Sequence, residues 1–129
     1  MKAATREWIE KAEADFTSAG REYRARSRPN FDASCFFAQQ CIEKYLKARL
    51  AEAGRLVPKI HDLSVLLDRV LPLEPLWEVA RPRLETLTSY AVIFRYPGES
   101  ATRTLAKTAI ADAGWVRKMI RASMNLGGR

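Results

Sequence analysis

The stretch that decides the fold runs from residue 31 to residue 53 and reads FDASCFFAQQCIEKYLKARLAEA. Its first half, residues 33–42, is apolar on nearly all sides, which is typical of a helix in the middle of a bundle. Its second half is amphipathic, with Leu46 and Leu50 on one face. Asn30 can cap the start of this helix and Gly54 can close it. The stretch therefore predicts a central helix on which other helices pack.

On its N-terminal side, residues 5–26 predict another helix, which Thr5 can cap. Apolar residues recur along this segment at spacings of three and four, which makes one stripe for burial. The stripe consists of Trp8, Ala12, Phe16, Ala19 and Tyr23. Pro29 and Asn30 then break the chain before the central helix.

On the C-terminal side the sequence predicts three further segments. A short helix runs over residues 62–70, and Pro75 suits the first turn of the next one. Pro82 must kink that next helix or divide it into two pieces, because proline removes a backbone hydrogen bond. A long helix over residues 100–124 ends the bundle before a frayed tail at residues 127–129. The sum is an all-α fold, an up-and-down bundle of about five helices.

The core predicted from these stripes takes residues from every long helix. It comprises Trp8, Phe16, Phe36, Phe37, Ile42, Leu46, Leu66, Leu67, Leu105, Ala109, Val116 and Ile120. A chain of 129 residues fits one domain, which we expect to span residues 1–129.

Composition narrows the class of protein. The longest uncharged run, residues 33–42, is far shorter than the roughly 20 residues that cross a membrane. The first residues have no apolar signal core, so we expect a cytoplasmic protein. Cys35 and Cys41 lie six apart in one helix and cannot pair there, so they are interpreted as buried thiols in a reducing compartment. With a single histidine, two cysteines make a zinc site improbable, and no metal or cofactor is expected.

The net charge of +7 favours polyanionic partners such as RNA, nucleotides or an acidic protein, although such charge can also serve solubility alone. Four arginines crowd the end of the first helix, namely Arg21, Arg24, Arg26 and Arg28. They can act as a phosphate-facing patch or favour the negative end of the helix dipole. We favour the second interpretation, because charge runs are usually solvated faces.

A polar stripe of Gln40, Lys44 and Lys47 follows one face of the central helix, and Glu43 can pair with Lys47. Buried unpaired charge is costly, so the stripe either reaches solvent at one edge or lines a groove or dimer seam.

Two further positions are candidates for chemistry. His61 precedes Asp62, a plausible cap, and a histidine beside a helix start is more often structural than catalytic. Arg95 lies in a stiff Arg-Tyr-Pro-Gly turn, where its planar fork can bind phosphate or tie the turn to a helix end.

Together these elements resemble the HEPN domain family over nearly the whole chain. The resemblance is carried by Trp8 and Asp15, by residues 36–44 (FFAQQCIEK) with Lys47, by residues 59–63 (KIHDL) with Leu67, and by Arg95-Tyr96-Pro97. It implies a helical bundle that is often homodimeric and often encoded beside a minimal nucleotidyltransferase, in toxin–antitoxin-like pairs.

Some family members are metal-independent ribonucleases that use an arginine followed four to six residues later by a histidine. Here no histidine follows Arg95, and Arg55 with His61 matches only the bare spacing, in a loop and beside an apolar Leu56. We therefore expect a nucleotide- or nucleic-acid-associated accessory module rather than an efficient enzyme. Its candidate ligand residues are Lys44, Lys47, His61 and Arg95. The alternatives are a ribonuclease that uses His61 with Arg55 or Arg95, and a purely structural, protein-binding dimerisation module.

Overall fold

The computed structural model describes residues 1–127, so the last two residues of the expected tail lie outside the described part. Within that part the chain forms five α-helices and one 3-10 helix and contains no strand. In chain order the elements are α1 (Ala3–Arg24), α2 (Phe31–Glu52), α3 (Leu63–Val70), η1 (Pro75–Ala80), α4 (Arg81–Ile93) and α5 (Arg103–Ser123). The predicted all-helical bundle is confirmed.

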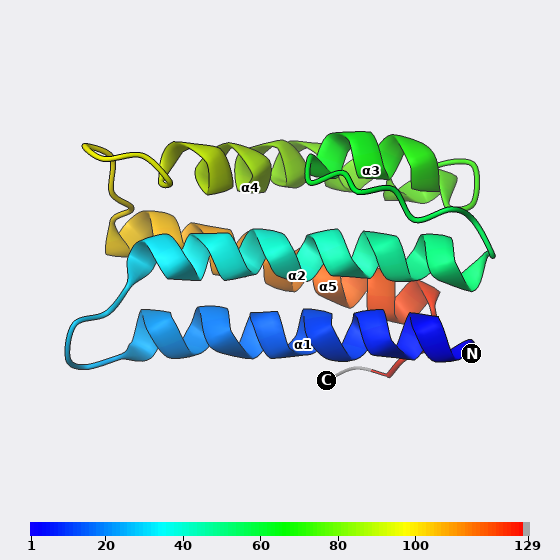
Figure 1. Ribbon diagram of the computed structural model, residues 1–129, viewed down its shortest axis with the longest axis horizontal. Coiled ribbons are helices and arrows are strands. Elements are labelled where there is room, and N and C mark those ends of the chain that lie inside the picture. Colours follow the sequence, from blue (N-terminus) through cyan, green and yellow to red (C-terminus); the bar gives the residue numbers. More distant parts are fainter. Residues whose placement is uncertain (128–129) are drawn as a thin grey trace.

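Helix α2 is the centre of the bundle. It packs against α1, α3, α4 and α5, and Figure 1 shows α1 beside it, the α3–α4 layer on its opposite side and α5 behind it. The loop between α2 and α3 turns at the end of α2 and runs back along that helix before α3 begins (Figure 1). That return path places residues 54–62 over the outer face of the central helix.

Local sequence signals fix most helix ends. The Asn30 side chain accepts from Ala33 N at 2.9 Å, and the Asp62 side chain accepts from Ser64 N at 2.9 Å, so both predicted caps are confirmed. Gly54 follows α2 with a φ of +70°, the left-handed conformation that glycine adopts without strain. Pro82 lies in the first turn of α4, so it divides the segment into η1 and α4.

The predicted cap at Thr5 is wrong. Helix α1 already begins at Ala3, and Thr5 is buried inside it, where its hydroxyl donates to Glu52 Oε1 at 2.9 Å. The backbone N–H of Lys2 donates to the same oxygen at 3.1 Å. A carboxylate from the end of α2 therefore holds the start of α1, and this long-range contact lets the helix begin two residues early.

The core is largely the predicted one, with one clear error. Ile42, Leu46, Leu66 and Leu67 are essentially fully buried, as are Ala109, Val116 and Ile120. Trp8, Phe16, Phe37 and Leu105 are only half-buried at its edge. Phe36 is 36% exposed and does not belong to the core. The second half of α2 is instead the more buried half, because α1, α5 and the returning loop cover it.

Both cysteines are buried and free, as predicted. Burial, with a smaller contribution from Asp32, raises the pKa of the Cys35 thiol to about 11. Burial also raises the pKa of the Cys41 thiol well above its usual value. Neither thiol is therefore poised to ionise near neutral pH. None of the helices in residues 1–127 is long and apolar enough to cross a membrane.

Candidate functional site

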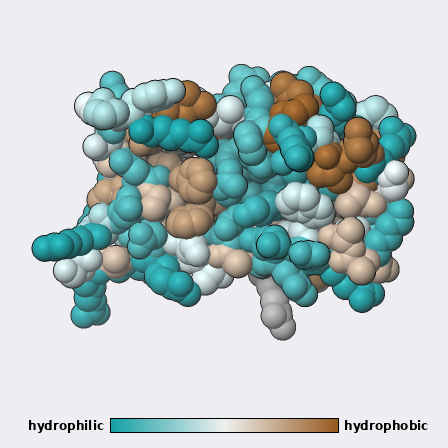
Figure 2. All heavy atoms as spheres, viewed as in Figure 1, coloured by the Kyte–Doolittle hydropathy of each residue, from teal (hydrophilic) through white to brown (hydrophobic). Residues whose placement is uncertain are grey.

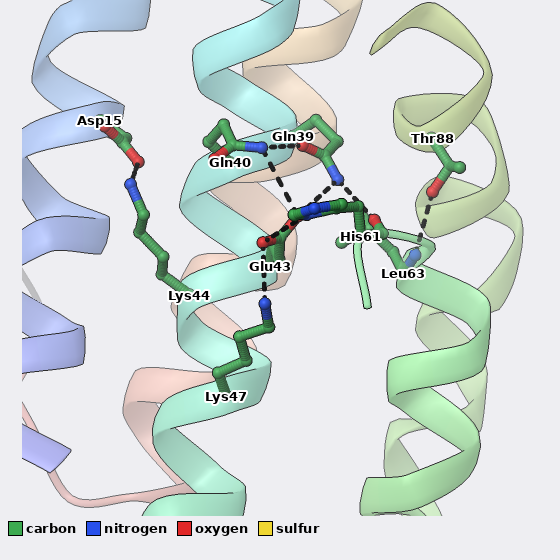
Figure 3. Close-up of polar contacts among 9 residues, drawn as sticks. All are labelled: Asp15, Gln39, Gln40, Glu43, Lys44, Lys47, His61, Leu63 and Thr88. Carbon is green, nitrogen blue, oxygen red and sulfur yellow. Dashed lines mark hydrogen bonds and ion pairs between the residues drawn. The ribbon is translucent and has the colours of Figure 1, made fainter. Parts of the chain in front are cut away.

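The outer face of α2 carries a polar cluster around the carboxylate of Glu43, whose side chain is only 5% exposed (Figure 3). Lys47 Nζ lies 3.0 Å from Glu43 Oε2, and His61 Nδ1 lies 3.1 Å from both carboxylate oxygens. Gln39 Nε2 donates to Glu43 Oε1 at 3.3 Å. We call Gln39, Gln40, Glu43, Lys47 and His61 the Glu43 cluster. A buried acid is thus surrounded by donors, which compensates the cost of its burial.

The returning loop is bound tightly to this cluster. Gln39 Nε2 donates to the backbone oxygen of His61 at 2.8 Å, and Gln40 Nε2 donates to Gln39 Oε1 at 2.8 Å, which orients the amide. Next along the chain, Leu63 N donates to Thr88 Oγ1 of α4 at 3.2 Å. His61 is therefore held through its backbone as well as its ring, at a point where α2 and α4 are tied together (Figure 3).

The two predicted lysines are both engaged inside the molecule. Lys47 has a side chain that is only 7% exposed, and its ammonium lies 5.7 Å from the centre of the Trp8 ring. Lys44 points to the other side of α2 and forms an ion pair with Asp15 of α1 (Figure 3). The predicted pairing of Glu43 with Lys47 is confirmed. The stripe is not an open solvated edge, because the chain itself covers much of it.

Arg95 lies apart from the Glu43 cluster but on the same side of α2. Its guanidinium lies 5.9 Å from the ring centre of Phe36, in the exposed turn after α4. Phe36 and Glu43 are seven residues apart on one helical face, which corresponds to about 10 Å along the axis. The structure therefore brings Lys47 and His61 together, sets Lys44 aside towards α1, and leaves Arg95 roughly two turns away.

Arg55 and His61 do not meet, despite their spacing in the sequence. The backbone N–H of Arg55 donates to Leu50 O at 2.9 Å, whereas His61 is bound at Gln39. Eleven residues of helix separate those two anchor points, about 16 Å along α2. The loop runs between them in extended form, so the Arg55–His61 spacing does not build a reactive pair within one chain.

The arrangement at His61 has a definite chemical capacity. A buried carboxylate engages Nδ1 and so favours the tautomer with the proton on that nitrogen. The side chain is 73% exposed, which leaves the ring open to solvent on its other side. A histidine held by a carboxylate in this way can transfer protons if a substrate is brought to it.

Sequence reasoning missed a second polar network, in which Glu13 of α1 binds two arginines of α5. Glu13 Oε1 accepts from Arg117 Nη2 at 2.6 Å, and its Oε2 accepts from Arg117 Nε at 2.7 Å. The Tyr45 hydroxyl donates to Glu13 and accepts from Arg121 Nη1 at 2.9 Å. Burial opposes ionisation of Glu13, but the bonds from Arg117 and Tyr45 prevail, so the pKa of Glu13 is lowered. The sequence signal for this network was the presence of Arg117 and Arg121 beside the apolar stripe of α5.

An open hollow of about 370 Å³ borders Trp8 on α1, with Ala4, Glu7 and Lys11 among its lining residues. Its size is at the lower end of the roughly 300–1,000 Å³ typical of small-molecule sites. Among residues 1–127, no three histidine, cysteine or acidic side chains are grouped so as to hold a metal ion.

Comparison with known proteins supports the class that this geometry suggests. The sequence model of the HEPN domain matches residues 5–123, which is nearly the whole chain. The chain therefore belongs to the HEPN family. Searches among curated proteins and among solved structures find no match.

Proposed function

We propose that this HEPN domain is a nucleotide- or nucleic-acid-associated accessory module without efficient cleavage chemistry of its own. The main observation behind this proposal is that the polar groups of the Glu43 cluster bind one another, and that the cluster contains no arginine. His61 has neither Arg55 nor Arg95 beside it, while Lys44 and Lys47 are each neutralised by a carboxylate. Such a cluster fixes the returning loop and presents one exposed histidine ring.

Ligand contact through this face then falls chiefly to Arg95 and His61, the two exposed candidates. The planar guanidinium of Arg95 suits a phosphate, and its contact with the Phe36 ring limits its freedom. The hollow beside Trp8, which Lys11 also lines, has a volume in the range of small-molecule sites. The net charge of +7 supports a polyanionic ligand.

Calorimetry with nucleotides and a short RNA tests this proposal. Arg95→Ala and His61→Ala should weaken binding at least several-fold, whereas Arg55→Ala, an equally exposed arginine outside the cluster, should leave it unchanged. Lys44→Ala should act mainly by lowering stability, because it leaves Asp15 unpaired. If neither ligand binds the wild-type protein, and a partner protein is captured instead, the structural alternative is favoured.

The partner expected from the family is a nucleotidyltransferase, in a toxin–antitoxin-like pair, and the chain itself is expected to form a homodimer. A patch of exposed apolar side chains around the start of α2 and the end of α4 supports self-association. The patch consists of Phe36, Val92, Ile93 and Tyr96. Symmetric dimers use one such patch on both copies. Light scattering at micromolar concentration should give twice the chain mass of 14.6 kDa, and a particle of 14.6 kDa would count against the dimer.

One observation favours the second candidate, a metal-independent ribonuclease. His61 is oriented by a buried carboxylate, which is how many catalytic histidines are held. In that case purified protein degrades RNA, and His61→Ala abolishes the cleavage while leaving the fold intact. Under the accessory-module proposal, wild-type protein and His61→Ala both leave RNA uncut.

A further inference from the structure

The end of the bundle that holds the α1–α2 loop carries arginines that the Glu43 cluster does not use. Four of the eight residues from 21 to 28 are arginines, and only one, Glu22, is acidic. All four arginines are exposed, and none has a carboxylate within ion-pair distance among residues 1–127. Figure 2 shows hydrophilic side chains projecting from this end of the molecule, where Figure 1 places the loop.

The helix dipole accounts for only part of this cluster. Helix α1 ends at Arg24, so Arg21 and Arg24 lie in its last turn, but Arg26 and Arg28 lie beyond it. Arg28 even adopts a φ of +52°, in the left-handed region that is unfavourable for an arginine. The sequence alone favours an interaction of the four arginines with the negative end of the helix dipole. That interpretation does not explain Arg26 and Arg28, which lie beyond the helix.

A fifth arginine reaches the same place from the other end of the chain. Arg103 is the first residue of α5, where the dipole disfavours a cation and where the first turn has no acidic residue to offset it. Its guanidinium lies 5.0 Å from the Phe31 ring centre and 5.9 Å from that of Tyr23. Those two rings contact each other with their centres 6.2 Å apart. Arg103 is thus an exposed cation beside two aromatic rings, with no acidic residue in its own first turn to offset it.

An open hollow of about 350 Å³ joins these segments. It is lined from Arg28 through Asp32 and by Ser100 and Ala101. The one carboxylate in its wall, Asp32, accepts from Ala101 N at 2.6 Å and so ties the two loops together. Arg28 lines this hollow, and the bond from Ala101 links the start of α2 to the segment that precedes α5.

We propose that Arg21, Arg24, Arg26, Arg28 and Arg103 form a binding surface for the phosphodiester backbone of a nucleic acid. Several unpaired guanidiniums on one end match a chain of phosphates spaced along a strand better than a single phosphate, and the Phe31 and Tyr23 rings add an aromatic element. The surface is separate from the Glu43 cluster. This inference takes from the proposed function only the class of ligand, a nucleic acid; the surface itself is argued from the arginines.

Fluorescence anisotropy with labelled 20-nucleotide RNA and DNA strands tests the surface. The test variant is Arg24→Gln/Arg26→Gln/Arg103→Gln, which leaves the strained Arg28 in place. The matched control, Arg6→Gln/Arg55→Gln/Lys118→Gln, removes the same charge from exposed positions away from this end. Circular dichroism checks that both variants keep the helical fold.

The test variant should bind at least about tenfold more weakly, and the slope of log affinity against log salt should fall by about 2, since each phosphate contact contributes about 0.7 for single strands. The control should lose less than about threefold, because it loses no direct phosphate contact. If RNA and DNA bind with the same affinity, the surface recognises the backbone that they share. If one of them binds more tightly, that nucleic acid is the natural ligand.

The inference is overturned by equal losses in the test variant and the control, by no binding of either strand, or by equally tight binding of polyglutamate. If Arg95→Ala and His61→Ala abolish binding while the arginine triple variant does not, this surface is refuted and the proposed function stands.

Discussion

Removal of the Glu43 carboxylate is the most direct test of how the polar cluster is built. In Glu43→Ala the Lys47 ammonium loses its partner at 3.0 Å, and because the Lys47 side chain is only 7% exposed, an uncompensated buried charge remains. Breaking a buried pair by deleting one partner costs about 3–5 kcal/mol, because a desolvated charge is left behind. Domains of this kind are stable by roughly 5–15 kcal/mol, so the change should consume a large share of the total.

A double replacement separates lost pairing from lost packing. Glu43→Leu/Lys47→Met removes both charges and roughly keeps the volume, and such exchanges are often close to neutral, within about 1–2 kcal/mol. The double variant should therefore be more stable than Glu43→Ala. His61 loses its carboxylate in both variants, but Gln39 still donates to its backbone oxygen, so the loop stays attached.

Urea unfolding followed by far-ultraviolet circular dichroism measures these differences. The control is Glu78→Ala, which breaks the ion pair with Arg81 at 2.7 Å. This pair is a suitable control because the Glu78 side chain is 54% exposed, so no buried charge is left behind. Such surface pairs contribute only about 0–1 kcal/mol. If Glu43→Ala costs no more than Glu78→Ala, or if the double variant is as unstable as the single one, the argument from buried charge is refuted.

Three further predictions follow from burial and pairing. Leu66→Ala should lower the free energy of unfolding by about 2–5 kcal/mol in urea titrations, whereas Phe36→Ala, at an exposed site, should cost the monomer less than about 1 kcal/mol. The lowered pKa of Glu13 gives stability that is complete above the unfolded-state pKa near 4.5 and is lost as pH falls through the folded-state pKa, so Glu13→Gln should flatten the decline of stability below about pH 5. A maleimide reagent at pH 7 should label Cys35 and Cys41 slowly in the native protein and rapidly in urea, because burial raises both thiol pKa values; rapid native labelling would contradict the buried position.

Sequence reasoning succeeded where a signal is local. The Asn30 and Asp62 caps need only a short polar side chain within three residues of a free backbone N–H. A break at Pro82, as a kink or a division, follows from the chemistry of proline, and the structure shows the division. The central place of α2 follows from its apolar surface, which no single neighbour could bury.

It failed where contacts are long-range. Thr5 looks like a cap until Glu52, 47 residues away, is brought beside it. Phe36 has the character of a core residue, yet it is 36% exposed and its ring contacts Phe37 and the Arg95 guanidinium at the edge of the bundle. Position along a stripe identifies which face is buried, but it does not say how far along the helix the neighbours extend.

The candidate site divides in the same way. The pairing of Glu43 with Lys47 was predictable, because four residues separate them on one helix. The contact of His61 with that carboxylate was not, because it depends on the path of the ten residues between α2 and α3. The Glu13 network escaped prediction for the same reason, since Arg117 lies 104 residues away in the sequence.

The net charge of +7 can be interpreted only when the cations that form ion pairs inside the bundle are separated from those that are exposed. Lys44, Lys47 and Arg117 are neutralised within the bundle by carboxylates that the fold brings to them. Lys44 joins α2 to α1, Lys47 pairs within α2, and Arg117 joins α5 to α1. The loss of these pairs should appear first as lower stability. Among the exposed cations that remain, Arg95 and the arginines around the α1–α2 loop are the ones proposed to meet a partner. Substitutions in these two groups should therefore separate in experiment: changes at Glu43 or Lys47 move the unfolding midpoint, whereas changes at Arg26 or Arg103 move ligand affinity and its salt dependence with the midpoint nearly fixed. If variants of the second group lower the unfolding midpoint while ligand affinity stays unchanged, the exposed arginines stabilise the fold rather than bind a ligand.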